Sequence, residues 1–135
     1  MKIYLAIPYS QCRALSYKIA NKVAAQLMES GHNVFSPISH SHSVSPYIDK
    51  ANHTHEFWME QDLPFVEWAD EVHVVVIGGY VEGHKRIARS KGVQEEIRHA
   101  TRFNKPVQYI YYYDNTEGVT DRKLDEIKGS DGACP

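Results

Sequence analysis

The chain of 135 residues is long enough for one domain with a hydrophobic core, and its 42% hydrophobic and 24% charged residues are an ordinary globular balance. A net charge of -2 gives none of the basic excess of proteins that bind nucleic-acid polymers, although a single nucleotide would need only a local site. No apolar run approaches the ~20 residues that cross a bilayer, so no membrane partner is expected.

Two further observations favour a cytoplasmic protein. The apolar start at residues 1–7 is too short for a signal peptide and is better interpreted as a first strand. Cys12 and Cys134 are too few for a disulfide or metal framework, and a reducing compartment is the default for such a chain.

Strands and helices alternate along the chain. Apolar residues three or four apart predict a helix that Gly31 ends, and a nearly unbroken β-branched run predicts a buried strand at 71–77. The expected elements are, in order, a strand at 2–7, a helix at 13–30, a short strand at 32–36, a helix at 57–68, a strand at 71–77, a helix from 90 or 92 to about 103, a strand at 106–113 and a short helix at 120–128.

Two segments between these elements are expected to be loops. Residues 37–55 are rich in Ser, His and Pro, and residues 78–89 carry several glycines. Loops of such length in a compact domain are often functional. The whole is expected to form one domain over residues 1–128, followed by a flexible tail at 129–135.

The alternation predicts an α/β fold, namely a three-layer sandwich with a mostly parallel, flavodoxin-like or Rossmann-like sheet of four to five strands. Ligands in such folds bind at the carboxyl ends of the strands, where the strand order reverses. Right-handed crossovers would bring the segments 8–12, 37–55 and 78–92 together at that edge.

Glu96 is the first candidate catalytic residue. It lies in the early turns of the helix that begins near Ser90, and the free N–H groups of that helix end would face the same cleft. A carboxylate in this position can attack or stabilise a sugar carbon. The alternative is that Glu95 and Glu96 are ordinary acidic residues of a first helical turn.

Asp62 is the second candidate, because paired carboxylates let one group act as a nucleophile while the other moves protons. The alternative is that Asp62 caps a helix restarting at Leu63, with Pro64 in its first turn. Tyr4 on the first strand and Tyr9 after it could hydrogen-bond a carboxylate or a sugar hydroxyl, or else serve as a core and a surface aromatic.

A local basic cluster favours an anionic ligand beside the predicted helix start. Ser90 and the amides around Gly92 could hold a phosphate there. Arg86, Arg89 and Lys91 would add positive charge, unless they belong to a solvated basic loop.

The histidines form two H-x-H pairs, His40 with His42 and His53 with His55. On a strand, such a pair places both rings on one face, and four imidazoles could bind a transition metal. The other interpretation, which we favour, is that His40 and His42 make polar contacts to substrate or anchor the loop. No metal or organic cofactor is expected.

Three blocks of sequence resemble a known superfamily. They are Tyr4-Leu5-Ala6 with Pro8, then Glu60-Gln61-Asp62-Leu63 leading to Ala69-Asp70, and Ser90, Gly92, Val93 and Glu96 leading to Ala100 and Lys105-Pro106-Val107.

Together these blocks, which extend from residue 2 to about 112, resemble the nucleoside 2-deoxyribosyltransferase superfamily. The resemblance implies cleavage of an N-glycosidic bond, with Glu96 attacking or stabilising C1′ of the sugar. It implies that Asp62 is the acidic partner and that Tyr4 is the strand-one tyrosine. It further implies a homo-oligomer, either a dimer or a tetramer.

Two departures from the superfamily pattern refine this expectation. Transferases of free nucleosides carry an aspartate six residues before the glutamate, where this chain has Ser90. In that respect the chain is similar to the nucleoside 5′-monophosphate N-glycosidases, which use the serine for the phosphate. The segment Ser36-Pro37-Ile38-Ser39-His40-Ser41-His42 and Trp58 look more like an uncharacterised branch.

The leading hypothesis is therefore an enzyme that cleaves or exchanges the N-glycosidic bond of a (deoxy)nucleoside 5′-monophosphate. The sequence leaves hydrolase and transferase open. Substrate contacts are expected from Ser90, Gly92, Pro8, Tyr9, His40, His42, Arg86 and Arg89. The alternatives are a non-catalytic nucleotide-binding or sensing domain, and a metal-dependent hydrolase built on His40, His42, His53 and His55.

Overall fold

The computed structural model describes residues 1–112, and the sequence predictions for 120–128 and 129–135 lie outside that part. Its strands form one sheet in the order β2-β1-β3-β4, and every pairing is parallel. This confirms the α/β fold with a parallel sheet. The strands are β1 (Lys2–Ala6), β2 (Asn33–Phe35), β3 (Glu71–Ile77) and β4 (Val107–Tyr112).

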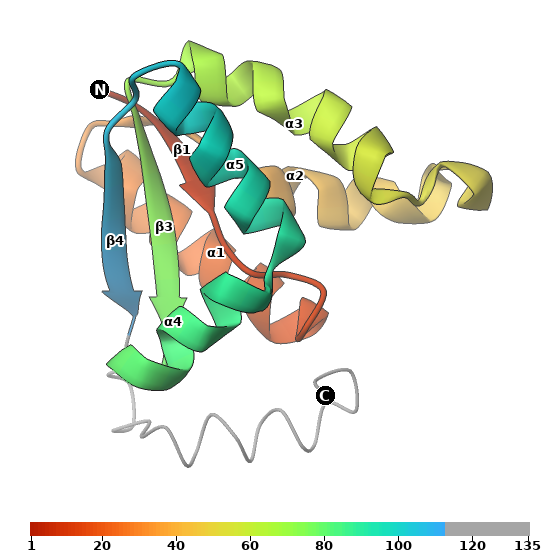
Figure 1. Cartoon of the computed structure of the whole chain (residues 1–135), viewed down its shortest axis with the longest axis horizontal. Helices are drawn as coiled ribbons and strands as arrows, with labels where there is room; N and C mark the ends of the chain where they lie inside the picture. Colours follow the sequence, from red (N-terminus) through yellow and green to blue (C-terminus); the bar gives the residue numbers. More distant parts are fainter. Residues whose placement is uncertain (113–135) are drawn as a thin grey trace.

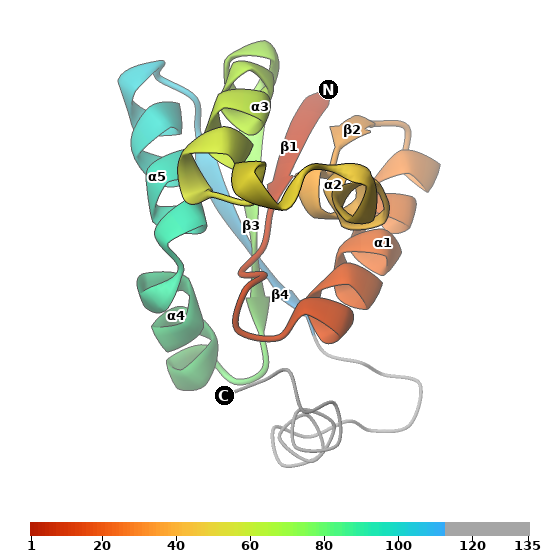
Figure 2. The ribbon, with the colours of Figure 1, turned by 90° about the vertical axis from the view of Figure 1, so that its right-hand side faces the viewer.

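Helices cover both faces of the sheet, with α3, α4 and α5 on one side and α1 and α2 on the other (Figures 1 and 2). Alternate residues of β1, together with the residue after it, explain the two layers, because Tyr4 and Ala6 pack under α3 and α5 whereas Leu5 and the following Ile7 pack under α1. The helices are α1 (Arg13–Glu29), α2 (Pro37–Val44), α3 (His55–Trp68), α4 (Tyr80–Arg89) and α5 (Lys91–Arg102).

The segment 37–55, expected to be a loop, is largely helical. Ser36 accepts a hydrogen bond from the Ser39 N–H and Pro37 occupies the first turn, so α2 begins with a regular cap. Two short 3-10 turns follow, Ser45–Tyr47 and Lys50–Asn52. The prediction was wrong because Ser, His and Pro are poor helix formers in general, yet Ser and Pro are favoured at a helix start.

The segment 78–89, also expected to be a loop, contains α4. Gly83 lies inside this helix, and a Cβ atom there would be 2.3 Å from Cγ1 of Val76 on β3. The glycine therefore permits close packing of helix against strand. Its presence in the sequence suggested a turn, but its role depends on a contact that only the fold creates.

Helix α3 is continuous through Pro64, so it does not restart at Leu63. Its cap is Thr54, whose hydroxyl accepts from the Phe57 N–H at 3.2 Å. Asp62 is thus a mid-helix residue, and the alternative interpretation of Asp62 as a cap is wrong.

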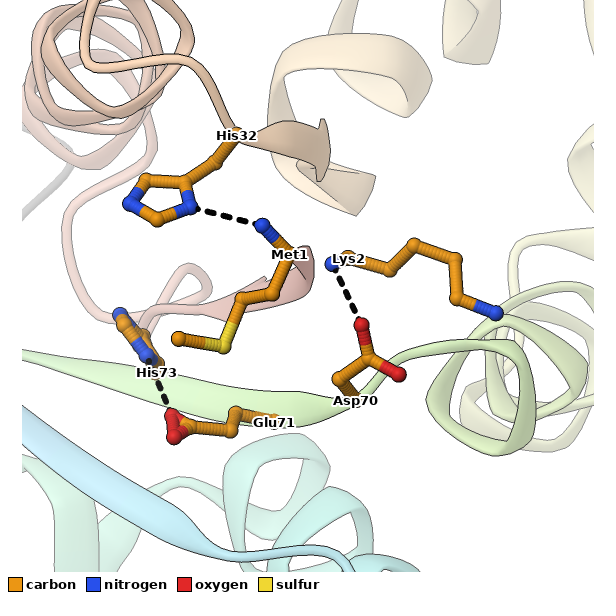
Figure 3. A network of polar contacts seen from close by, with 6 residues as sticks. All are labelled: Met1, Lys2, His32, Asp70, Glu71 and His73. Carbon is orange, nitrogen blue, oxygen red and sulfur yellow. Dashed lines mark hydrogen bonds and ion pairs between the residues drawn. The ribbon is translucent and has the colours of Figure 1, made fainter.

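Polar contacts tie the chain start to the amino ends of the strands (Figure 3). The Lys2 N–H donates to Asp70 at 2.8 Å, and the Asp70 N–H returns a bond to the Lys2 carbonyl at 2.7 Å. The bond from Lys2 is the main reason that the pKa of the Asp70 carboxyl lies below its usual value. The Met1 amine is 3.0 Å from Nδ1 of His32. The Lys2–Asp70 bonds fix the start of β1 beside that of β3, and the Met1–His32 contact joins it to the segment before β2. All of them lie at the end of the sheet opposite to the cavity described below.

Candidate functional site

A cavity of about 430 Å³ lies at the carboxyl ends of the strands, which is a size typical of small-molecule sites. It is bounded by the segment after β1, by α2, by one face of α3 and by the start of α5. The expected convergence of segments is confirmed for the first two. From the third, only Ser90, Lys91 and Gly92 line the cavity.

Glu96 forms part of the cavity wall and is 5% exposed. It lies on α5, one turn after Val93, which packs into the core between helix and sheet. The hydroxyl of Tyr4, from the central strand β1, donates a hydrogen bond to Oε2 of Glu96. A strand and a helix distant in sequence therefore hold one carboxyl group in a fixed place.

Asp62 is the second buried carboxyl at the cavity, 7% exposed and carried by α3. Burial raises the pKa of Asp62 to about 7. Burial is also the main cause that raises the pKa of Glu96 to about 8, with smaller upward contributions from Asp62 and Glu95. The Tyr4 hydrogen bond opposes that rise.

These two carboxyls can share protons near neutral pH. Groups that interact in this way titrate as a pair, so one can be ionised while the other keeps its proton. Such a pair can supply a nucleophile and a proton donor together. Tyr4 is itself buried, and burial together with Glu96 holds its pKa well above 10, so its hydroxyl remains a donor.

Ser90 caps α5 at the cavity, where its Oγ accepts from the Val93 N–H at 3.3 Å. A hydroxyl that accepts one bond still has its own proton to donate, so Ser90 can meet an anion without losing the cap. Gly92 also lines the cavity, and a Cβ there would have an ordinary 3.7 Å contact with Met59.

The expected basic residues are distributed differently. Arg86 is buried on α4, where Nη1 donates to the Ile77 carbonyl at 2.5 Å, and Arg89 is exposed at the end of that helix. Neither is among the residues that line the cavity, whereas Arg13 and Lys91 are. Within residues 1–112, no carboxylate forms an ion pair with Arg13 or Lys91.

Tyr9 and His42 meet at the cavity, with the Tyr9 hydroxyl 2.7 Å from Nδ1 of His42. The His42 ring also stacks on Tyr17, with centroids 4.0 Å apart. Burial raises the pKa of Tyr9. His40 is exposed and lies outside the lining, as does Pro8, whose carbonyl accepts from the Ser16 hydroxyl at 2.6 Å.

The geometry removes the basis of the metal hypothesis. Because His40 and His42 lie on a helix, residues two apart point in different directions. His53 contacts the Ile48 carbonyl at 3.1 Å, and His55 faces Glu95. In the part of the chain that the structure describes, no three His, Cys, Asp or Glu side chains are grouped to hold a metal.

The sequence pointed to His55 only as a metal ligand, and no substrate contact was expected from three residues of the cavity, namely Arg13, His55 and Trp58. The last two belong to a helical series on α3 that continues through Met59 to Asp62. The spacing i, i+3, i+4, i+7 was present in the sequence. It was missed because the predicted helix began two residues too late.

The family described as Domain of unknown function (DUF1937) has a model that matches residues 1–112. The chain belongs to the DUF1937 family. No curated protein matches this DUF1937 chain. No helix within residues 1–112 is both long and apolar enough to cross a membrane.

A solved structure shares the DUF1937 fold. It is a 2-deoxyribosyltransferase from the psychrotolerant bacterium Bacillus psychrosaccharolyticus, with a TM-score of 0.59 and 24% identity over 93% of this chain and 81% of that one. The fold expected from the superfamily resemblance is thereby confirmed. The matching family is itself uncharacterised, in agreement with the resemblance of residues 36–42 and Trp58 to an uncharacterised branch.

Proposed function

We propose that this protein cleaves or exchanges the N-glycosidic bond of a (deoxy)nucleoside 5′-monophosphate. The observation that carries the proposal is the buried Glu96 carboxyl at the cavity, hydrogen-bonded by Tyr4 and close enough to Asp62 for their charges to interact. The shared fold with a 2-deoxyribosyltransferase supports the same reaction class. A fold hosts several functions, so the site residues decide.

In this mechanism the ionised Glu96 stabilises positive charge at C1′ or forms a glycosyl-enzyme intermediate. Tyr4 orients the carboxylate through its hydroxyl. Asp62 is the partner carboxyl, and it positions the proton that the two groups share near neutral pH. Water as acceptor completes a hydrolysis, and a second base completes a transfer.

The monophosphate is proposed on the chemistry around Ser90. Its hydroxyl and the N–H groups at the start of α5 are donors suited to a phosphate. Arg13 and Lys91 add cations at the same cavity. Lys91 belongs to the basic cluster expected from the sequence, whereas Arg13 takes the place suggested for Arg86 and Arg89.

The experiment is release of free base from a panel of nucleosides and their 5′-monophosphates. The wild type should release base from at least one monophosphate, and Glu96→Ala should abolish this without loss of the folded state. Turnover by Glu96→Ala at the wild-type rate would contradict the assigned role. A nucleotide that binds yet remains whole on long incubation would identify a non-catalytic nucleotide-binding domain.

Specificity for the phosphate is tested at Ser90 and Arg13. Ser90→Asp retains a good helix cap but places a negative charge where the phosphate is proposed to bind. It should lower kcat/KM for the monophosphate more than kcat/KM for the nucleoside, so that the ratio of the two falls. Arg13→Gln should raise KM for the monophosphate alone. Unchanged ratios in both variants would mean that the phosphate is not recognised here.

A further inference from the structure

His55 lies on the same face of α3 as Asp62, one turn before Met59, and all three line the cavity. Asp62 is 7% exposed, whereas the side chain of His55 is 22% exposed. The histidine is therefore nearer to solvent along the wall of the cavity. A base attached to a sugar held at Glu96 would extend away from C1′ along such a wall.

Glu95, the neighbour of Glu96 on α5, faces this imidazole. Nε2 of His55 is 3.3 Å from Oε2 of Glu95, whose side chain is 35% exposed. The distance is that of an ion pair, although the alignment does not meet hydrogen-bond geometry and Nε2 is otherwise buried without a partner. Such contacts in enzymes without ligand are often loose and tighten when substrate binds.

A carboxylate at one ring nitrogen fixes the orientation and tautomer of an imidazole and leaves the other nitrogen for a ligand. Here Glu95 occupies Nε2, so Nδ1 is the nitrogen available to a bound molecule. A His–carboxylate pair at a cavity wall is an arrangement suited to proton transfer. No role in the proposed mechanism has so far used it.

We propose that His55, oriented by Glu95, donates the proton to the departing base. This inference rests on the proposed function. As the C1′–N bond breaks, its electron pair passes to the base, and a ring nitrogen of that base takes the proton from His55. Glu96 bonds to C1′ or stabilises its positive charge. When water or a second base then attacks C1′, the proton that the acceptor loses returns to His55.

The test compares two leaving groups. 2′-Deoxyguanosine 5′-monophosphate needs a proton on its base for fast departure, whereas its 7-methyl derivative already carries positive charge on the base and departs without one. With a no-enzyme blank subtracted, His55→Gln should lower kcat/KM for the first by about 10²-fold or more and for the second by less than about tenfold. Because Glu95 only positions the imidazole, Glu95→Gln should show the same selectivity between the two substrates with a smaller loss of kcat/KM.

His99→Gln is the matched control. His99 and Glu67 form a second His–Glu pair between α5 and α3, with Nε2 and Oε2 3.0 Å apart, and neither residue is among those that line the cavity. His99→Gln should leave both substrates unaffected. An equal loss on both substrates in His55→Gln, or no loss on either, would overturn the proposal.

The two proposals fail in different ways. If the wild type releases base from no monophosphate of the panel, the proposed function is overturned and this inference with it. If the wild type is active and His55→Gln matches it on both nucleotides, only the role of His55 is overturned. Selective loss in Asp62→Asn instead of His55→Gln would assign the proton to Asp62.

Discussion

The Tyr4–Glu96 hydrogen bond decides how easily the central carboxyl ionises. Burial raises the pKa of Glu96 to about 8, and the donated hydrogen bond from Tyr4 counteracts part of that rise. A catalytic carboxylate must be ionised to attack C1′. The tyrosine therefore widens the pH range in which the site is active.

Replacing Tyr4 by Phe should move the acid limb of the pH profile of kcat/KM to higher pH. The reason is that the buried carboxylate loses the donor that stabilises its charge. The measurement is kcat/KM for a monophosphate between about pH 6 and 10. Tyr9→Phe is the control, since the Tyr9 hydroxyl contacts His42 and not Glu96. An unmoved limb in Tyr4→Phe would refute the role given to this bond.

Glu96 should also make stability depend on pH. Its folded-state pKa is raised from 4.5 to about 8, so the folded protein binds this proton more tightly than the unfolded chain does. The resulting stabilisation is present below about pH 4.5 and is lost as the pH rises to about 8. Glu96→Gln has no such titration.

The free energy of unfolding of Glu96→Gln should therefore fall less than that of the wild type between pH 5 and 9. The difference should be on the order of a few kcal/mol, since one pKa unit corresponds to about 1.4 kcal/mol. Urea unfolding at each pH measures it, with Glu95→Gln as the more exposed control. Parallel curves for wild type and Glu96→Gln would show that Glu96 ionises as freely as in the unfolded chain.

At the scale of elements, Gly83 determines how closely α4 can approach β3. A methyl group there would meet Val76 at 2.3 Å and the Ile77 carbonyl at 3.2 Å. Gly83→Ala should lower the free energy of unfolding by about 1–3 kcal/mol, as overpacking does. Gly92→Ala should be neutral or slightly stabilising, because its methyl group has room and alanine favours a helix. Equal stability of the two variants in urea unfolding would contradict the packing argument.

The strands and the helices α1 and α5 could be predicted from the sequence because their signals are local. Apolar spacing, a β-branched run and the cap at Ser90 act within a few residues of each other. The segments that became α2 and α4 could not be predicted in this way. Their glycine, serine and proline residues are favourable only at a cap or against a neighbouring strand, and such contacts exist only after folding.

The candidate site shows the same division. Glu96, Asp62 and Tyr4 were identified from the superfamily spacing, and the structure brings all three together. Arg86 was expected to contact substrate, but it lies on α4 outside the cavity, because the segment of that helix was expected to be a loop. Arg13 could not be identified as a cavity residue, since its position depends on where α1 begins relative to α2.

At the scale of the whole molecule, the cavity joins elements that are distant in sequence, so a bound nucleotide should stabilise the fold. In Glu96→Gln, which should not consume the ligand, a monophosphate at 100 times its Kd adds about 2.7 kcal/mol. For a domain of this size the expected rise in Tm is on the order of 10 °C. Thermal unfolding with the nucleotide and with the matching nucleoside at the same concentration measures the contribution of the phosphate. An equal rise with both would contradict phosphate recognition.

The proposed assembly also belongs to this scale. The superfamily resemblance implies a dimer or a tetramer, and this remains a prediction. Light scattering of the purified protein would determine the number of subunits.

Base release by Glu96→Gln tests the central claim most directly. The variant keeps the size and shape of the side chain and removes only its ability to ionise. At saturating monophosphate and pH 8, its rate should be lower than that of the wild type by about 10³-fold or more, while nucleotide binding persists. Base release at the wild-type rate by a folded Glu96→Gln would contradict the account.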